Sequence, residues 1–161
     1  MRGLLLFVFG VAIGLLVQSA IAQNQNPGVV GLNHVALSVA NMDEAVRYYT
    51  QTMGFPEAFR VTDSNGQPTI VYVQISKNTF VELQPATPQR APGFNHFGLH
   101  VENIETTAAM FKQRGASVSD INRGSQTKAI LANITDPTGI RIELAELPPS
   151  SMHRLAMDRW K

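Results

Sequence analysis

The sequence predicts an α+β fold built from two similar halves, each with the element order β-α-β-β-β. The stretch "NHVALSVANM" returns 62 positions later as "NHFGLHVENI", and "FVELQP" returns as "RIELAE". Glu82 follows His34 by 48 positions, and Glu143 follows His96 by 47. Chance does not usually preserve two such spacings at once, so we interpret the halves as repeats of one module.

Both histidine stretches and both glutamate stretches alternate in the manner of strands with one apolar face. The apolar faces comprise Val35, Leu37, Val39, Val81, Leu83, Phe97, Leu99, Val101, Ile142 and Leu144. The opposite faces carry the histidines and glutamates, together with Ser38, Phe80, Gln84, His100 and Arg141. We therefore expect each apolar face to be covered by a helix and the other faces to carry the chemistry.

A helix is predicted after each histidine strand. Asn41 is a suitable N-cap with Glu44 three positions later, and apolar residues recur at four-residue spacing. In the first helix these are Ala45, Tyr49 and Met53 before Gly54, and in the second, which begins near Asn103, they are Ile104, Ala108 and Phe111 before Gly115. Further strands are expected at 69–76 and 128–135, next to the turn sequences "DSNGQP" and "DPTG".

The two ends of the chain do not fit the repeat. Residues 1–22 have a basic start at Arg2, an apolar run and small residues ending in Ala20-Ile21-Ala22, which is typical of an export signal. A membrane anchor that is not cleaved is the alternative, because the apolar run approaches a membrane-spanning length. Residues 23–30 are then a linker and 148–161 a polar C-terminal tail, and we expect a periplasmic or secreted protein that does not stay in the membrane.

Composition excludes several classes of function. The net charge is +1, without a basic run, so nothing favours nucleic acid or anionic lipid as a partner. There is no cysteine, which excludes disulfides and thiolate metal sites. What remains is one domain of ordinary size with room for a hydrophobic core.

The repeated polar faces point to a metal site. His34, Glu82, His96 and Glu143 would supply two imidazoles and two carboxylates, a ligand set that suits zinc, nickel, cobalt, manganese or iron. A histidine or glutamate alone is more often structural, but the pair is repeated on the same face both times. His100 faces the same side and is interpreted as a pocket residue or a proton shuttle, or as a passive wall. No role is assigned to His153.

From about Gly31 to Leu147 the chain resembles the vicinal oxygen chelate superfamily, which includes glyoxalase I, methylmalonyl-CoA epimerase, extradiol dioxygenases and the bleomycin resistance proteins. The motifs "LNHVALSV", "FVELQP", "FNHFGLHVENIE" and "ITDPTGIRIELAEL" carry the resemblance. It implies modules at 31–87 and 93–147 that form one curved, eight-stranded mixed sheet around a metal-binding cavity, with the helices outside. It also implies that His34, Glu82, His96 and Glu143 bind one divalent metal.

The complete ligand set is most similar to bacterial glyoxalase I, but two positions depart from that pattern. Ser38 and Ala86 stand where glyoxalases carry an arginine and an asparagine that hold glutathione. We therefore expect a glyoxalase-like isomerase or lyase that acts on a small substrate with two vicinal oxygens, without glutathione. Glu143 or Glu82 would be the general base, and the substrate pocket would include Tyr72, Phe80, His100 and Arg141.

Two other functions remain open in the sequence. With ferrous iron and Glu82 unbound, the site would suit an extradiol-type dioxygenase; without metal, the cavity would suit a binding or resistance protein. Small members of the superfamily often form homodimers with shared sites, so a homodimer is expected. The sequence does not decide whether the four ligands come from one chain.

Overall fold

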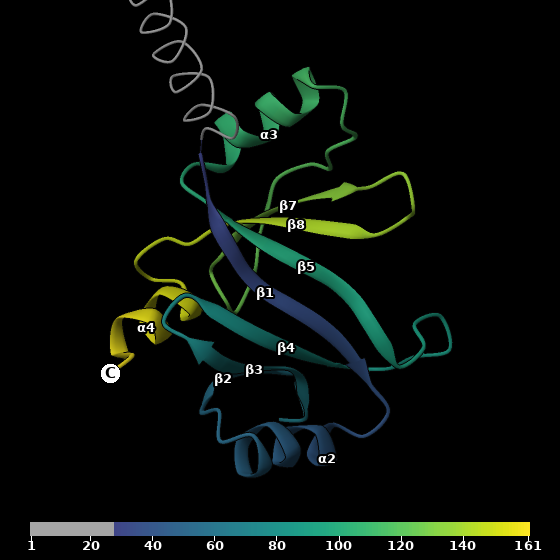
Figure 1. The fold of residues 1–161 in the computed structure, drawn as a ribbon, viewed down its shortest axis with the longest axis vertical. Helices are drawn as coiled ribbons and strands as arrows, with labels where there is room; N and C mark the ends of the chain where they lie inside the picture. The colour runs from purple at the N-terminus through teal and green to yellow at the C-terminus, as the bar shows by residue number, and fades with distance from the viewer. Residues whose placement is uncertain (1–27) are drawn as a thin grey trace, which may run out of the picture.

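The computed structural model describes residues 28–161 as a single curved sheet with helices on both of its faces (Figure 1). The first half contains β1 (Val29–Val39), α2 (Met42–Arg47), the π-helix η1 (Tyr48–Thr52), β2 (Glu57–Thr62), β3 (Pro68–Ser76) and β4 (Thr79–Pro85). The second half contains β5 (Gly93–Val101), α3 (Ile104–Gln113), β6 (Asn122–Arg123), β7 (Ile130–Thr135), β8 (Arg141–Glu146) and α4 (Met152–Arg159).

The strand order reflects the repeat. The eight strands are arranged as β2-β3-β4-β1-β5-β8-β7-β6, so each half contributes four neighbouring strands. The histidine strand of each half runs parallel to its own glutamate strand, β1 beside β4 and β5 beside β8. The two histidine strands pair antiparallel at the centre. The α+β fold with a mixed eight-stranded sheet is confirmed, and its order brings all four predicted ligand strands together.

Two of the helices cover the outer face, as the apolar pattern predicts. Leu37, Val39, Val81 and Leu83 pack with α2, and Leu99, Val101, Ile142 and Leu144 pack with Ile104 and Phe111 of the second half. Asn41 and Asn103 cap the two helices by accepting hydrogen bonds from Glu44 N and Thr106 N. These elements leave the opposite, concave face to the histidines and glutamates.

The expectation that Met53 extends the buried stripe of the first helix is wrong, since its exposed fraction is 47%. The helix widens into a π-helix from Tyr48, and Met53 N bonds to Tyr48 O, five positions back. This wider turn rotates the following residues away from the core.

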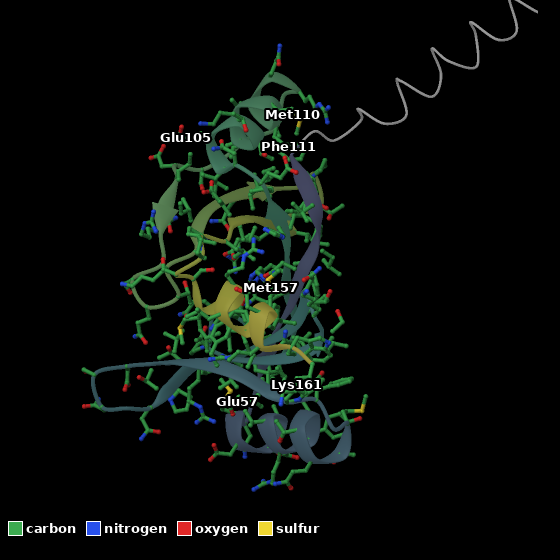
Figure 2. All side chains as sticks on the ribbon, turned by 90° about the vertical axis from the view of Figure 1, so that its left-hand side faces the viewer. Glu57, Glu105, Met110, Phe111, Met157 and Lys161 are labelled. Atoms are coloured by element: carbon green, nitrogen blue, oxygen red, sulfur yellow. The ribbon has the colours of Figure 1, made fainter. Side chains whose placement is uncertain are left out.

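Residues 152–159 form α4, and this helix lies within the curl of the sheet. Ser151 caps it by accepting a bond from Arg154 N, and His153, Ala156 and Met157 are buried. Ala156 and Met157 pack with concave-face residues of both halves, among them Phe59, Tyr72, Phe80, Ala145 and Leu147. Figure 2 shows Met157 in the middle of the molecule. The C-terminal segment expected to be a polar tail thus belongs to the core, and one helix is not outside the sheet.

The proposed signal, residues 1–22, and most of the linker lie outside the described residues, while Val29 and Val30 already belong to β1. No helix within residues 28–161 is long and apolar enough to cross a bilayer.

We expect Met157→Ala to lower the free energy of unfolding by about 2–5 kcal/mol, because it leaves a cavity between α4 and the sheet. Leu155→Ala on the same helix is the matched control. Its side chain is 47% exposed, so its effect should stay within about 0.5 kcal/mol. Urea denaturation of the two variants measures the difference, and equal effects would contradict the packing of α4.

Candidate metal centre

The two histidines sit opposite small residues of the neighbouring central strand. In the antiparallel register of β1 and β5, His34 faces Gly98 and His96 faces Ala36. An ideal Cβ on Gly98 would lie 2.6 Å from His34 Nε2 and would also collide with Nδ1 and Cε1. The absence of a side chain at Gly98 is therefore what gives the imidazole of His34 its place on the concave face.

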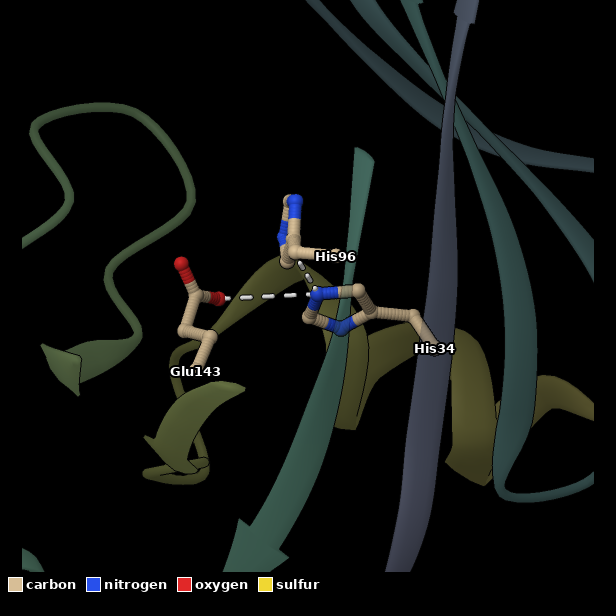
Figure 3. Close-up of side chains that lie close together, drawn as sticks. All are labelled: His34, His96 and Glu143. Carbon is tan, nitrogen blue, oxygen red and sulfur yellow. Dashed lines mark hydrogen bonds and ion pairs between the residues drawn. The ribbon is translucent and has the colours of Figure 1, made fainter. Parts of the chain in front are cut away.

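Side chains from both halves converge at this place (Figure 3). His34 Nε2 lies 3.1 Å from His96 Nε2, 3.3 Å from Glu82 Oε2 and 3.6 Å from Glu143 Oε1. His96 Nε2 lies 3.8 Å from Glu82 Oε2. Ligand atoms that bind one divalent metal at about 2.1 Å are spaced similarly. All four predicted ligands thus lie around one place within a single chain, and the three whose ligand atoms all lie within 4.8 Å of one another are His34, His96 and Glu143.

Both imidazoles are oriented by the residue that precedes them. His34 Nδ1 lies 3.0 Å from Asn33 Oδ1, and His96 Nδ1 lies 3.1 Å from Asn95 Oδ1. An amide oxygen only accepts hydrogen bonds, so Nδ1 of His34 carries the proton. Nδ1 of His96 also lies 2.6 Å from the donor Arg141 Nη2, so its two neighbours favour opposite tautomers. The amide of Asn95 is itself oriented, because its Nδ2 donates to Ser38 Oγ at 3.1 Å. The Nε2 lone pair of His34 consequently faces the centre, and Nε2 of His96 lies 3.1 Å from it.

The centre gathers two imidazoles and two carboxylates in a buried place. Burial lowers the pKa of His34, and it lowers the pKa of His96 to about 3 with a further contribution from the positive charge of Arg141. The histidines are thus neutral at pH 7 and do not supply the missing positive charge. Two neutral imidazoles and two carboxylates packed this closely are stabilised by a cation between them, so the residues present fit a divalent metal.

The two carboxylates are held differently. Glu82 accepts a hydrogen bond from Tyr72 Oη at 2.6 Å and a second from Gln84 Nε2. Among residues 28–161, Glu143 has one hydrogen-bond donor, Arg141 Nη1, at 3.4 Å. Burial, followed by the charge of Glu82, raises the pKa of Glu143 to about 7. Glu82 is therefore fixed in place, whereas Glu143 is freer and its pKa suits proton exchange near neutral pH.

Arg141 places a guanidinium beside the acceptor cluster. Its Nη2 lies 2.6 Å from Nδ1 and 3.2 Å from Nε2 of His96, and its Nη1 donates to Asn133 at 3.1 Å. The shorter of the two contacts to the ring is the one to Nδ1. A metal bound at Nε2 would put the ring proton on Nδ1, and the guanidinium would then have to move away from that nitrogen.

A cavity of about 210 Å³ adjoins the cluster. Its walls combine the polar groups of Glu82, Gln84, Arg141 and Glu143 with apolar surface from Val61, Ile70, Ala129 and Leu131. Two of the predicted pocket residues, Tyr72 and Arg141, line this cavity. Phe80 lies instead in the hydrophobic core, fully buried, and His100 lines a separate hollow with Arg154 and Pro148. These two placements differ from expectation because α4 fills the part of the concave face between them and the cavity.

A loop at 124–127 forms another wall of the cavity and is tied to both neighbouring elements. Gln126 Nε2 donates to Thr62 O at 2.7 Å, and Thr62 N donates back to Gln126 Oε1 at 3.3 Å. Met152 N, at the start of α4, donates to Thr127 O at 2.9 Å. The loop thus links the β2 edge of the first half to the C-terminal helix.

Sequence reasoning missed four residues of this site. Asn33 and Asn95 precede the histidines in both copies of the repeat, and this repetition is the signal that was present. Gln84 lies on the same strand face as Glu82, two positions away. His153 had no sequence signal, since only the docking of α4 brings it to the cavity.

Comparisons with known proteins identify chains similar to this one. The chain is 26% identical over 129 residues to a probable chloroplastic lactoylglutathione lyase of Arabidopsis thaliana, a match over 73% of this chain and 36% of the relative. It thus spans about a third of that protein's length. A probable lactoylglutathione lyase of Synechocystis sp. is 25% identical over 126 residues, 71% of this chain and 94% of the relative.

The fold is shared with methylmalonyl-CoA epimerase from Mycobacterium tuberculosis, with a TM-score of 0.65 and 21% identity over 76% of this chain and 91% of that one. The family description "Glyoxalase/Bleomycin resistance protein/Dioxygenase superfamily" matches residues 31–144. The chain therefore belongs to the glyoxalase/bleomycin resistance/dioxygenase superfamily, the vicinal oxygen chelate proteins.

Proposed function

We propose that this protein is a divalent-metal-dependent isomerase or lyase acting on a small substrate with two neighbouring oxygens. One observation carries the proposal: the Nε2 atoms of His34 and His96 lie 3.1 Å apart in a buried place, where carboxylate oxygens of Glu82 and Glu143 lie 3.3 Å and 3.6 Å from His34 Nε2. The enzymatic character of the relatives supports it.

The residues of the centre would have different roles in the reaction. His34, His96, Glu82 and Glu143 would hold the metal, which would supply Lewis-acid polarisation of a substrate carbonyl when bound. Glu143, which has the weaker hydrogen bonding and a pKa of about 7, would take a proton from the carbon beside that carbonyl and return it. The sequence left the choice between the two carboxylates open, and the ties of Glu82 to Tyr72 and Gln84 favour Glu143 as the base.

The substrate is proposed to be small and free of glutathione. The cavity of about 210 Å³ has room for a compact molecule beside the metal. Ser38, at the place of a glutathione-binding arginine in glyoxalases, is buried and hydrogen-bonded to Asn95. Its hydroxyl therefore positions His96 through Asn95 and is not presented to a ligand.

A second candidate is an iron-dependent dioxygenase of the extradiol type. Ligand atoms of His34, His96 and Glu143 all lie within 4.8 Å of one another, which gives a group of two histidines and one carboxylate. Such a facial set with open positions is typical of non-heme iron oxygenases. In this alternative Glu82 stays with Tyr72 and Gln84 and does not bind the metal.

Metal analysis tests both candidates. The protein, purified without a metal-binding tag, would be compared by mass spectrometry with a His34→Ala/His96→Ala variant. His100→Ala is the control, because His100 lies on β5 with His96 but outside the cluster. We expect one equivalent of metal in the wild type and the control and none in the double variant.

The identity of the metal then separates the candidates. Zinc, nickel, cobalt or manganese would support the isomerase or lyase, and iron would favour the dioxygenase. A wild type that takes up no metal even after reloading would overturn both candidates, and a binding protein without catalytic activity would then be the remaining interpretation.

Export and the homodimer stay predictions, which secretion assays and light scattering would check.

A further inference from the structure

His153 is a buried histidine without a polar partner. Its side chain is 3% exposed, and neither ring nitrogen has a hydrogen-bond partner among the residues that the structure describes. Burial lowers its pKa to about 3, so the ring is neutral at pH 7 and offers one donor and one acceptor. Leaving such groups unpaired in a protein interior destabilises the folded state.

The surroundings of this ring would suit an apolar side chain better. Its centroid lies 4.6 Å from that of Tyr72, 4.8 Å from Phe59 and 5.6 Å from Phe80, each at a steep interplanar angle. A phenylalanine would make similar ring contacts without the cost of unpaired nitrogens. Packing therefore does not account for a histidine at position 153.

The helix holds the ring in a fixed place beside the site. His153 is in the first turn of α4, two positions after the buried cap Ser151. It lines the same cavity as Glu82, Glu143 and Arg141, and its ring lies 6.3 Å from that of His34 at an interplanar angle of 30°. A ligand that fills this cavity beside the cluster therefore meets the imidazole of His153.

We propose that His153 is a substrate-binding residue, which hydrogen-bonds to a third oxygen of the substrate beyond the two that chelate the metal. This inference rests on the proposed function and narrows its substrate class. The substrate carries a hydroxyl or carbonyl next to its chelating pair, because a neutral imidazole pairs with either. An analogue with a methyl group in that place would leave the imidazole unpaired and be rejected.

Two hydroxamates that differ in one hydroxyl test this pairing. Acetohydroxamate offers two neighbouring oxygens for the metal, and glycolohydroxamate adds a hydroxyl beside them. Titration calorimetry of the metal-loaded protein should show about tenfold tighter binding of glycolohydroxamate. In His153→Phe the ratio should fall to near one while acetohydroxamate binds as before.

Two further variants separate hydrogen bonding from packing. His153→Gln keeps a donor and an acceptor and should retain part of the preference. Phe59→Leu alters the ring contacts of His153 and should leave the ratio unchanged. In the wild type, ¹⁵N NMR should show the ring nitrogens of His153 shifting with glycolohydroxamate and not with acetohydroxamate.

The outcomes distinguish the two proposals, provided that metal content is measured in every sample. A wild type that holds metal but shows no preference, or a His153→Phe variant that keeps it, overturns the role of His153 alone. A wild type that holds no metal overturns the proposed function, and it also overturns the role of His153, because that role depends on a metal-bound substrate. Loss of both ligands together in His153→Phe would also contradict a contact specific to the third oxygen.

Discussion

Replacing Gly98 with alanine is expected to weaken metal binding by about 100-fold or more, although this residue offers no ligand atom. The new methyl group would overlap the imidazole of His34, with its carbon 2.6 Å from Nε2. The strand backbone fixes the position of Cβ, so the ring must leave the place where its lone pair meets His96 and Glu82. Chelator competition followed by metal analysis measures the loss.

Gly31→Ala is the matched control for this change. Gly31 lies on β1, the strand that pairs with the strand of Gly98, and a Cβ there meets no atom within 4 Å. It should keep wild-type metal affinity. If Gly98→Ala binds metal as tightly as the wild type, His34 is not a ligand in the position seen here.

Glu143→Gln is expected to slow catalysis by about 10²- to 10⁴-fold even at saturating metal, because the amide does not accept the substrate proton. The assay follows exchange of the carbon-bound protons of hydroxyacetone in D₂O by NMR. This probe has two neighbouring oxygens and is small relative to the cavity of about 210 Å³. Metal affinity should fall as well, so the metal concentration has to be varied.

Glu82→Gln provides the comparison for this effect. Its side chain keeps an oxygen for the metal, and Tyr72 remains as a hydrogen-bond donor beside it. We expect weaker metal binding but a rate at saturating metal within about tenfold of the wild type. If instead Glu82→Gln abolishes exchange and Glu143→Gln does not, the base is Glu82.

Much of the site could be predicted because the chemistry was duplicated along the chain. The similar spacings from His34 to Glu82 and from His96 to Glu143 identified four strands, and alternation put all four side chains on the face away from α2 and α3. The strands and helices of each half could then be predicted from the ordinary periodicities of apolar residues in these elements. Local patterns of this kind are readable because neighbouring residues in the sequence decide them.

Contacts between distant segments decided the rest. The distances between the two halves depend on the pairing of β1 with β5, and the room for His34 depends on Gly98, which lies across that pairing. Whether Phe80 and His100 reach the cavity depends on α4, which fills part of the concave face. The sequence by itself determined the module, its faces and the candidate ligands. Only the tertiary structure decided that one chain completes the cluster and that His153 borders it, because docking a short amphipathic helix depends on a surface that no local pattern describes.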